Sequence, residues 1–169
     1  MRARIVGLVF VLGLVAVGVA VAGANRNWST HADGSLEVPA RDTKGQAQAI
    51  FHLSKDGTQL QYKLIASNIE NVVQAHIHSG GPGVNGGIVV FLYGLVASGG
   101  GRTDGVLSQG TFTADDFIAP FKGELTLEQL VEMMDSGLAY VNVHTNDGVG
   151  LPNSGPGDFP GGEVRGDIR

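Results

Sequence analysis

Apolar and polar residues alternate one by one in several short stretches of this chain, and turn-forming segments rich in Gly, Asp and Asn separate them. The alternation is clearest in residues 45–53, 60–66, 72–78 and 138–144. A period of two puts successive side chains on opposite faces of a strand, so each stretch is predicted to be a strand with one face in a core. Between the first two, Gly57 stands where a hairpin turn requires a positive φ. The pattern predicts an all-β domain.

Five further segments are less regular. Residues 88–93 are apolar at every position, which predicts a central strand covered on both faces. Residues 106–112 are predicted to be a weak strand and residues 161–169 a short one. Residues 97–105 are typical of a Gly/Ser loop, and residues 25–33 of a polar entry to the domain. The last two segments are not expected to contribute strands.

One helix is predicted between residues 126 and 137. Thr126 and Gln129 have the spacing of a capping box, and Gly137 is placed to end the helix. Its apolar stripe consists of Leu127, Leu130, Val131 and Met134. A stripe of this kind packs on a sheet, so the helix is expected to close one end of the domain. A single helical turn is predicted after Thr113, which is followed by two acidic residues.

Composition agrees with one β-rich domain. The chain has 169 residues, of which 27 are Gly, and only 16% of the residues are charged. Many glycines and few charges suit tight turns around a single core better than a helical bundle. No repeat of fixed period divides the sequence. Residues 25–169 are therefore predicted to form a single domain.

The first 24 residues have the pattern of a signal peptide. Arg2 and Arg4 precede an uncharged apolar run, residues 5–22, and small residues follow at the spacing that signal peptidase recognises. Cleavage would make the protein secreted, periplasmic or attached to the cell surface. The alternative is an uncleaved membrane anchor, because a run of 18 apolar residues is close to the shortest span. Membrane contact is expected only through this segment.

Charge, cysteine content and motifs exclude several function classes. The formal net charge is −5 and no basic stripe is visible, which argues against nucleic acid as a partner. Because the chain has no Cys, any metal must be bound by His, Asp or Glu. No Gly-x-Ser-x-Gly elbow is present, and the Gly-rich segment 80–87 is not followed by Lys as a phosphate loop would be. We therefore expect no enzymatic activity.

Three histidines form the candidate site. His76 and His78 share the face of residues 72–78 that points away from the core, with Cα atoms about 6.6 Å apart. His144 ends the strand predicted at 138–144, also on its polar face. If the two strands are neighbours, the three imidazoles meet at one end of a sheet and form a candidate site for copper or zinc. Glu163 is a candidate to hold an imidazole N–H from outside the metal's ligands.

The same histidines allow two other interpretations. Imidazoles at strand ends can bond to loop carbonyls, to Asn142 or to Glu163, and so fix the Gly-rich turns without any ligand. They can also contact another protein or a glycan. The residue pattern alone leaves these alternatives open.

Four short motifs resemble those of the CHRD domain, the module that is repeated in chordin and occurs alone in many bacterial exported proteins. The motifs are Glu-Val-Pro at 37–39, Ala-His-Ile-His at 75–78 with the Gly and Val residues that follow, Tyr-Val-Asn-Val-His-Thr at 140–145, and Gly-Gly-Glu-Val-Arg-Gly at 161–166. The resemblance covers roughly residues 29–168. One departure is the Gly/Pro-rich insertion at 149–159, which bears on how exposed His144 is.

The resemblance implies a fold and a general role. The fold would be a Greek-key-like β-sandwich of the superoxide-dismutase or immunoglobulin-like type, with one or two short helices. It implies no established catalytic activity. We therefore expect a single-domain, exported, non-enzymatic module with a binding or structural role in the cell envelope or extracellular space, whose partner is an unidentified protein or extracellular ligand.

A weaker similarity links His76-Ile77-His78, near a strand end and before Gly, to copper–zinc superoxide dismutase. Dismutase chemistry needs a fuller set of histidines, with a bridging imidazole and a zinc-binding Asp. Here the two remaining histidines, His31 and His52, lie far away in the sequence. Redox catalysis is therefore not expected.

Overall fold

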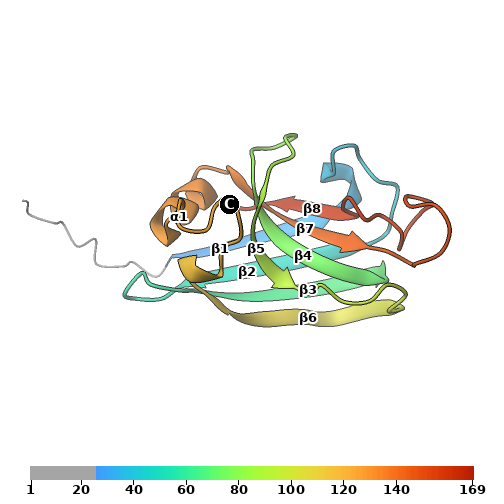
Figure 1. Cartoon of the computed structure of the whole chain (residues 1–169), viewed down its shortest axis with the longest axis horizontal. Coiled ribbons are helices and arrows are strands. Elements are labelled where there is room, and N and C mark those ends of the chain that lie inside the picture. Colours follow the sequence, from blue (N-terminus) through green and yellow to red (C-terminus); the bar gives the residue numbers. More distant parts are fainter. Residues whose placement is uncertain (1–25) are drawn as a thin grey trace, which may run out of the picture.

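The computed structural model describes residues 26–169, so the signal peptide expected at 1–24 lies outside the described residues. Figure 1 shows the arrangement of the elements. In chain order they are β1 (Asn27–Asp33), the 3-10 turn η1 (Gly34–Leu36), β2 (Gln46–Leu53), β3 (Leu60–Glu70), β4 (Val72–Ser79), β5 (Ile88–Tyr93), β6 (Arg102–Phe112), the 3-10 turn η2 (Ala114–Asp116), α1 (Leu127–Asp135), β7 (Ala139–Thr145) and β8 (Val164–Asp167).

The described strands form one antiparallel sheet, in the order β5-β4-β7-β8-β1-β2-β3-β6. The sheet folds over, so that β4, β5 and β7 lie in front of β1, β2 and β3 (Figure 1). The prediction of an all-β fold with few helices is confirmed. The two layers are halves of one hydrogen-bonded sheet, whereas a sandwich would have two separately bonded sheets.

The two edges of the sheet approach each other. Tyr62 on β3 and Ser108 on β6 both donate hydroxyl hydrogen bonds to the carbonyl of Leu92 on β5, at 2.8 and 2.7 Å. The backbone N–H of Ile118, which follows η2, donates to the carbonyl of Val89 on the same edge strand at 2.9 Å. Two backbone acceptors of the edge strand β5 are therefore occupied by other parts of the chain.

The apolar core lies between the two halves of the sheet. Along β2, buried residues alternate with more exposed ones, as a half-buried strand requires. From the other half, Ala75 and Ile77 on β4 and Val141 and Val143 on β7 point into the same core and are fully buried. Every second residue of β4 and β7 thus points into the core. The intervening residues, which include the three candidate histidines, lie on the opposite face.

The predicted helix is confirmed. The Thr126 hydroxyl accepts from the Gln129 N–H at the start of α1, and the Gln129 side chain accepts from the Thr126 N–H in return. Gly137, with φ 66°, follows the end of the helix. The residues of the predicted stripe are the buried residues of α1 and join the core. Within residues 26–169, no helix is long and apolar enough to cross a membrane.

Three expectations about strands were wrong. The polar entry is strand β1, in which Trp28, Thr30 and Ala32 are buried in alternation and the strand pairs along its whole length with β2. The loop expected at 97–105 ends early, because β6 begins at Arg102. Residues 88–93 do form a strand, but β5 is an edge strand and not a central one. It is apolar on both faces because one face covers the core and the other covers His76.

Candidate metal centre

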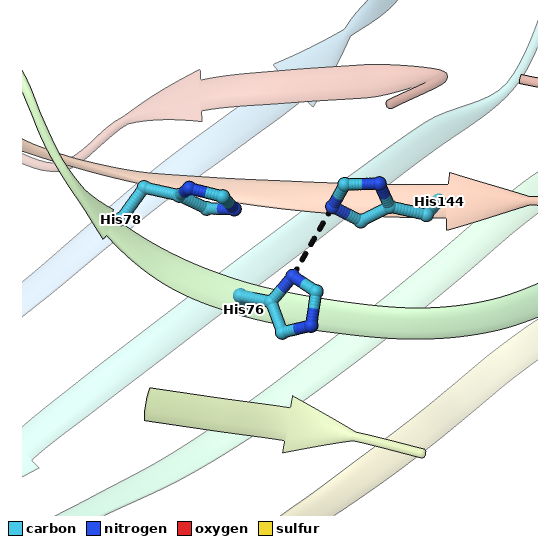
Figure 2. A group of neighbouring side chains, drawn as sticks. All are labelled: His76, His78 and His144. Atoms are coloured by element: carbon cyan, nitrogen blue, oxygen red, sulfur yellow. Dashed lines mark hydrogen bonds between the residues drawn. The ribbon is translucent and has the colours of Figure 1, made fainter. Parts of the chain in front are cut away.

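The three candidate histidines lie on one face of two neighbouring strands. β4 and β7 pair antiparallel, with His76 opposite Asn142 and Gln74 opposite His144. His144 is therefore the diagonal neighbour of His76, and His78 lies two residues further along the same face of β4. Figure 2 shows the three rings turned toward one another from the two strands. The prediction that they meet is confirmed.

The distances between the rings are short. The ring centroids are 4.8 Å apart for His76 and His144, 5.3 Å for His76 and His78, and 6.0 Å for His78 and His144. One nitrogen of each ring lies within 4.8 Å of one nitrogen of the other two, and no other His, Asp or Glu group among residues 26–169 has this spacing. The cluster lies in the middle of the paired strands and not at one end of the sheet, because antiparallel strands end in opposite directions.

The histidines are buried, although they lie on the faces of their strands that point away from the apolar core. The exposed fractions are 0% for His76, 7% for His78 and 6% for His144. Phe91 of β5 packs edge-on against the His76 ring, with 4.4 Å between centroids. Tyr140 of β7 stacks on His78 at 4.8 Å, with 10° between the ring planes. The imidazoles therefore form part of a polar layer that is itself covered.

Residues 80–87, which we call the cover loop, close over His78. Nδ1 of His78 donates to the carbonyl of Gly86 at 3.0 Å, and the N–H of Gly86 donates to the Tyr140 hydroxyl at 3.1 Å. Only Gly fits at position 86, because a Cβ atom there would lie 1.4 Å from the carbonyl oxygen of Ser79. The Gly-rich sequence after His78 thus allows the loop to return close to its own strand.

Arg165 of β8 fixes the cover loop from the other side. Its side chain is fully buried, and its guanidinium donates to the carbonyls of Val84 and Gly81 at 3.0 and 2.8 Å. It also pairs with Asp167 at 3.0 Å and stacks on the Tyr140 ring at 3.6 Å from the centroid. Four partners on three elements therefore hold one cation in place. The residue pattern gave no reason to expect this role.

The hydrogen bonds determine which ring nitrogens carry protons. His144 Nδ1 lies 2.8 Å from the carbonyl oxygen of Pro160. Because a carbonyl oxygen can only accept a hydrogen bond, Nδ1 carries the proton and Nε2 carries the lone pair. His76 Nδ1 lies 3.1 Å from that Nε2 and must be the donor. His78 Nδ1 likewise donates to Gly86. The Nε2 atoms of His76 and His78 are left as buried lone pairs with no hydrogen-bond partner.

The three imidazoles are held in the neutral form. Burial, and to a smaller extent the neighbouring His144 and His78, lower the pKa of His76 to about 3. Burial lowers the pKa of His144 to about 4. The pKa of His78 is also lowered, chiefly by burial, against the effect of its bond to Gly86. Neutral imidazoles are the form that binds metals.

Glu163 does not contact the histidines. One carboxylate oxygen accepts from the Thr43 hydroxyl at 2.6 Å, and the other accepts from the Thr145 hydroxyl and the Gly157 N–H at 2.6 and 2.8 Å. The expectation that Glu163 holds an imidazole N–H is not met, because the backbone carbonyl of Pro160 takes that place for His144. Glu163 anchors the last part of the insertion at 149–159, and Pro160, just after it, covers His144.

A second buried polar contact joins three of the four sequence motifs. The Asn142 amide donates to the Glu37 carboxylate at 2.8 Å. A Cβ atom on Gly162 would lie 2.7 Å from the side chains of both residues. Burial raises the pKa of Glu37 to about 7, although Arg165 and Arg41 oppose the shift. Glu37 was visible only as a motif position, since nothing in an isolated Glu-Val-Pro indicates burial.

Gly162→Ala is expected to lower the free energy of unfolding by about 2 kcal/mol or more, from overpacking and backbone strain together. The added methyl group would press on Asn142 and Glu37, and the φ of 122° at this position is one that side-chain-bearing residues rarely adopt. Urea denaturation measures the change. Gly161→Ala is the matched control, because its Cβ would meet only Arg41 at 3.7 Å. Equal effects of the two substitutions would contradict this account of the contact.

The comparison with known protein families gives one match. The family model of the CHRD domain matches residues 28–152, which is most of the chain and includes all three histidines. The match ends within the insertion, before Glu163 and β8. No curated protein and no solved structure gave a significant match.

Proposed function

Because this chain belongs to the CHRD domain family, we propose that it is an exported, non-enzymatic module that binds one copper or zinc ion through His76, His78 and His144. The family alone indicates a domain module and does not specify a ligand. The secreted, periplasmic or cell-surface location is proposed from the pattern of residues 1–24.

The observation that carries the proposal is the convergence of three buried imidazoles, each with one nitrogen within 4.8 Å of one nitrogen of the other two. The Nε2 of His78 is buried, has no hydrogen-bond partner, and is the nitrogen left to bind an ion because Nδ1 donates to Gly86. An unsatisfied buried polar atom costs about 1–3 kcal/mol, and an ion bound to His78 would remove that cost. A metal ion accepts lone pairs from neutral imidazoles, which is the form that burial imposes here.

The geometry is close to that of a three-histidine site. Nitrogens bound to one ion at 2.0–2.1 Å lie about 3.4 Å apart in a tetrahedral arrangement, and His76 Nδ1 and His144 Nε2 are already 3.1 Å apart. The carbonyls of Gly86 and Pro160 hold the outer N–H groups of His78 and His144, which is the usual arrangement behind a metal-bound imidazole. In Figure 2 the other nitrogen of His76 points away from the two neighbouring rings. His76 would therefore bind through Nδ1 and carry its proton on Nε2.

Metal binding is tested by titrating chelator-treated protein with zinc and copper ions while following its melting temperature. An ion that binds only the folded state stabilises it by about 2.7 kcal/mol at 100 times its dissociation constant. We expect one ion per chain and no shift after His76→Gln, His78→Gln or His144→Gln. His31→Gln and His52→Gln, which alter histidines outside the cluster, should bind as the wild type does. Absence of any shift, together with no metal in elemental analysis, would reject the proposal.

The second candidate is a purely structural role for the histidines. It is favoured by the bonds from His78 to Gly86 and from His144 to Pro160, which fix two loops without any ion. The same variants distinguish the two functions. A structural role predicts that His78→Gln lowers stability in the absence of metal while the wild type binds none.

A further inference from the structure

We infer that the ion bound by the three histidines is monovalent, with Cu(I) as its biological form, and that the site discriminates against Zn(II) and Cu(II). The inference rests on the proposed metal-binding function and specifies its ligand. It is drawn from the charges around the cluster and from the number of donors that the described residues can offer.

The donor set contains no negative charge. The cluster consists of three imidazoles, and no Asp or Glu of residues 26–169 joins it. The chain has no Cys. Carboxylates on the elements around the cluster are engaged elsewhere, Glu37 with Asn142, Asp167 with Arg165, and Glu163 with Thr and Gly donors. An ion at this site would therefore keep its full charge.

The surroundings favour the smaller charge. Arg165 is a buried cation stacked on Tyr140, and Tyr140 in turn stacks on His78. The energy of moving an ion from water into a poorly polar interior rises with the square of its charge, so a divalent ion costs about four times as much as a monovalent one of the same size. With no carboxylate or thiolate to offset it, this cost acts mainly against Zn(II) and Cu(II).

The number of donors points the same way. Zn(II) takes four ligands and usually completes a three-histidine site with water, whereas Cu(II) prefers four donors in a plane. Phe91, the cover loop and Pro160 enclose the cluster, and none of the described pockets is lined by the three histidines. Three nitrogens without a fourth donor suit Cu(I), which carries a single charge and is stable with two or three ligands.

The test compares ions of different charge on the same chelator-treated protein. Ag(I) in chloride-free buffer serves as a monovalent probe that needs no reductant, and Cu(I) is measured anaerobically against a chromogenic Cu(I) chelator. We expect both to bind one per chain, at least 100-fold more tightly than Zn(II) or Cu(II). Zn(II) binding as tightly as Ag(I) would overturn the inference and leave the proposed function standing. Binding of none of the ions would overturn both.

Two sets of variants make the result specific. Ag(I) also binds thioethers, and the chain has three Met, so Ag(I) binding that survives in the triple variant H76Q/H78Q/H144Q would overturn the inference. The double variant E37Q/N142D moves the carboxylate onto the residue paired with His76. It should improve Zn(II) binding relative to Ag(I) by at least tenfold, and an unchanged ratio would count against the charge argument. Nitrogen NMR shifts of the imidazoles in the wild-type protein locate the bound ion directly, so this measurement does not depend on whether the variants fold.

Discussion

The Arg165→Met protein is expected to lose about 3–5 kcal/mol of its free energy of unfolding, the usual result of breaking a buried ion pair by removing one partner. Met preserves much of the length and apolar volume of Arg, so the loss would reflect the guanidinium group and not a cavity. Asp167 would be left as a largely buried carboxylate without its cation. The carbonyls of Gly81 and Val84 would lose their donors, and Tyr140 would lose the cation on its ring.

Urea denaturation at pH 7 measures this loss, and Arg102→Met is its matched control. Arg102 also pairs with an Asp two residues away, but the side chains of Arg102 and Asp104 are 55% and 49% exposed. An exposed pair contributes about 0–1 kcal/mol, so the same substitution should have little effect there. Hydrogen exchange adds a second readout, because the cover loop should exchange faster in the Arg165 variant. A loss no larger than that of the control would mean that Arg165 does not fix the loop.

The metal-free protein should lose a net amount of about 3 kcal/mol of stability between pH 7 and pH 4. At about 1.4 kcal/mol for each unit of pKa displacement, His76 and His144 account for a loss of about 6 kcal/mol and Glu37 for an opposing gain of about 3 kcal/mol. In the unfolded chain the histidines become protonated below the ordinary pKa of 6.5, whereas the folded state holds His76 at about 3 and His144 at about 4. Over this interval the unfolded state binds more protons. The stability that comes from the neutral imidazoles is therefore complete above pH 6.5 and is lost as the pH falls.

Glu37 opposes about half of the loss that comes from the histidines. Its pKa is raised from 4.5 to about 7 in the folded state, so its contribution to stability is complete below pH 4.5 and is lost as the pH rises through 7. Glu37→Gln removes the opposing titration. The variant should be more stable than the wild type at pH 8, and its acid-induced loss should be about twice as large.

Denaturation curves at half-unit pH intervals, in the presence of a chelator, test both statements. Several Asp residues also have lowered pKa values, but their ordinary pKa is 3.8. Their titration therefore affects stability mostly below the interval from pH 7 to pH 4. A wild-type stability that stays constant from pH 7 to pH 4.5, with the same constancy in Glu37→Gln, would contradict buried neutral histidines. When the same curves are measured without chelator on the metal-bound protein, the loss of stability should begin at a lower pH than in the metal-free protein.

Local patterns in the sequence were sufficient for much of the fold. The capping box at Thr126 and Gln129 and the alternation in β2 and β3 depend on residues close together in the chain, and the structure has them as predicted. The meeting of His76, His78 and His144 was also predictable, because both strands carry the same alternation and the family motif. β1 was missed because its outward positions are polar, although Trp28, Thr30 and Ala32 already alternate with them.

The burial of the site could not be predicted, because it depends on contacts between distant segments. Arg165 and the cover loop are about 80 residues apart in sequence, and Asn142 and Glu37 are 105 apart. A period of two tells which side chains share a face, but not what lies over that face. For the same reason β5 was expected to be central: an apolar strand has the same pattern whether a second strand or a ring such as that of His76 covers it.

The closure of the sheet edges bears on how the molecules behave when they are concentrated. An exposed edge strand is a template on which a second chain can add a strand, and β5 is apolar enough to be a strong one. On this strand the carbonyl of Leu92 is already bound by two hydroxyl groups and that of Val89 by the backbone of Ile118. Strand addition at β5 would have to displace these bonds. A chain without a single disulfide thus protects its most aggregation-prone edge with hydrogen bonds of its own.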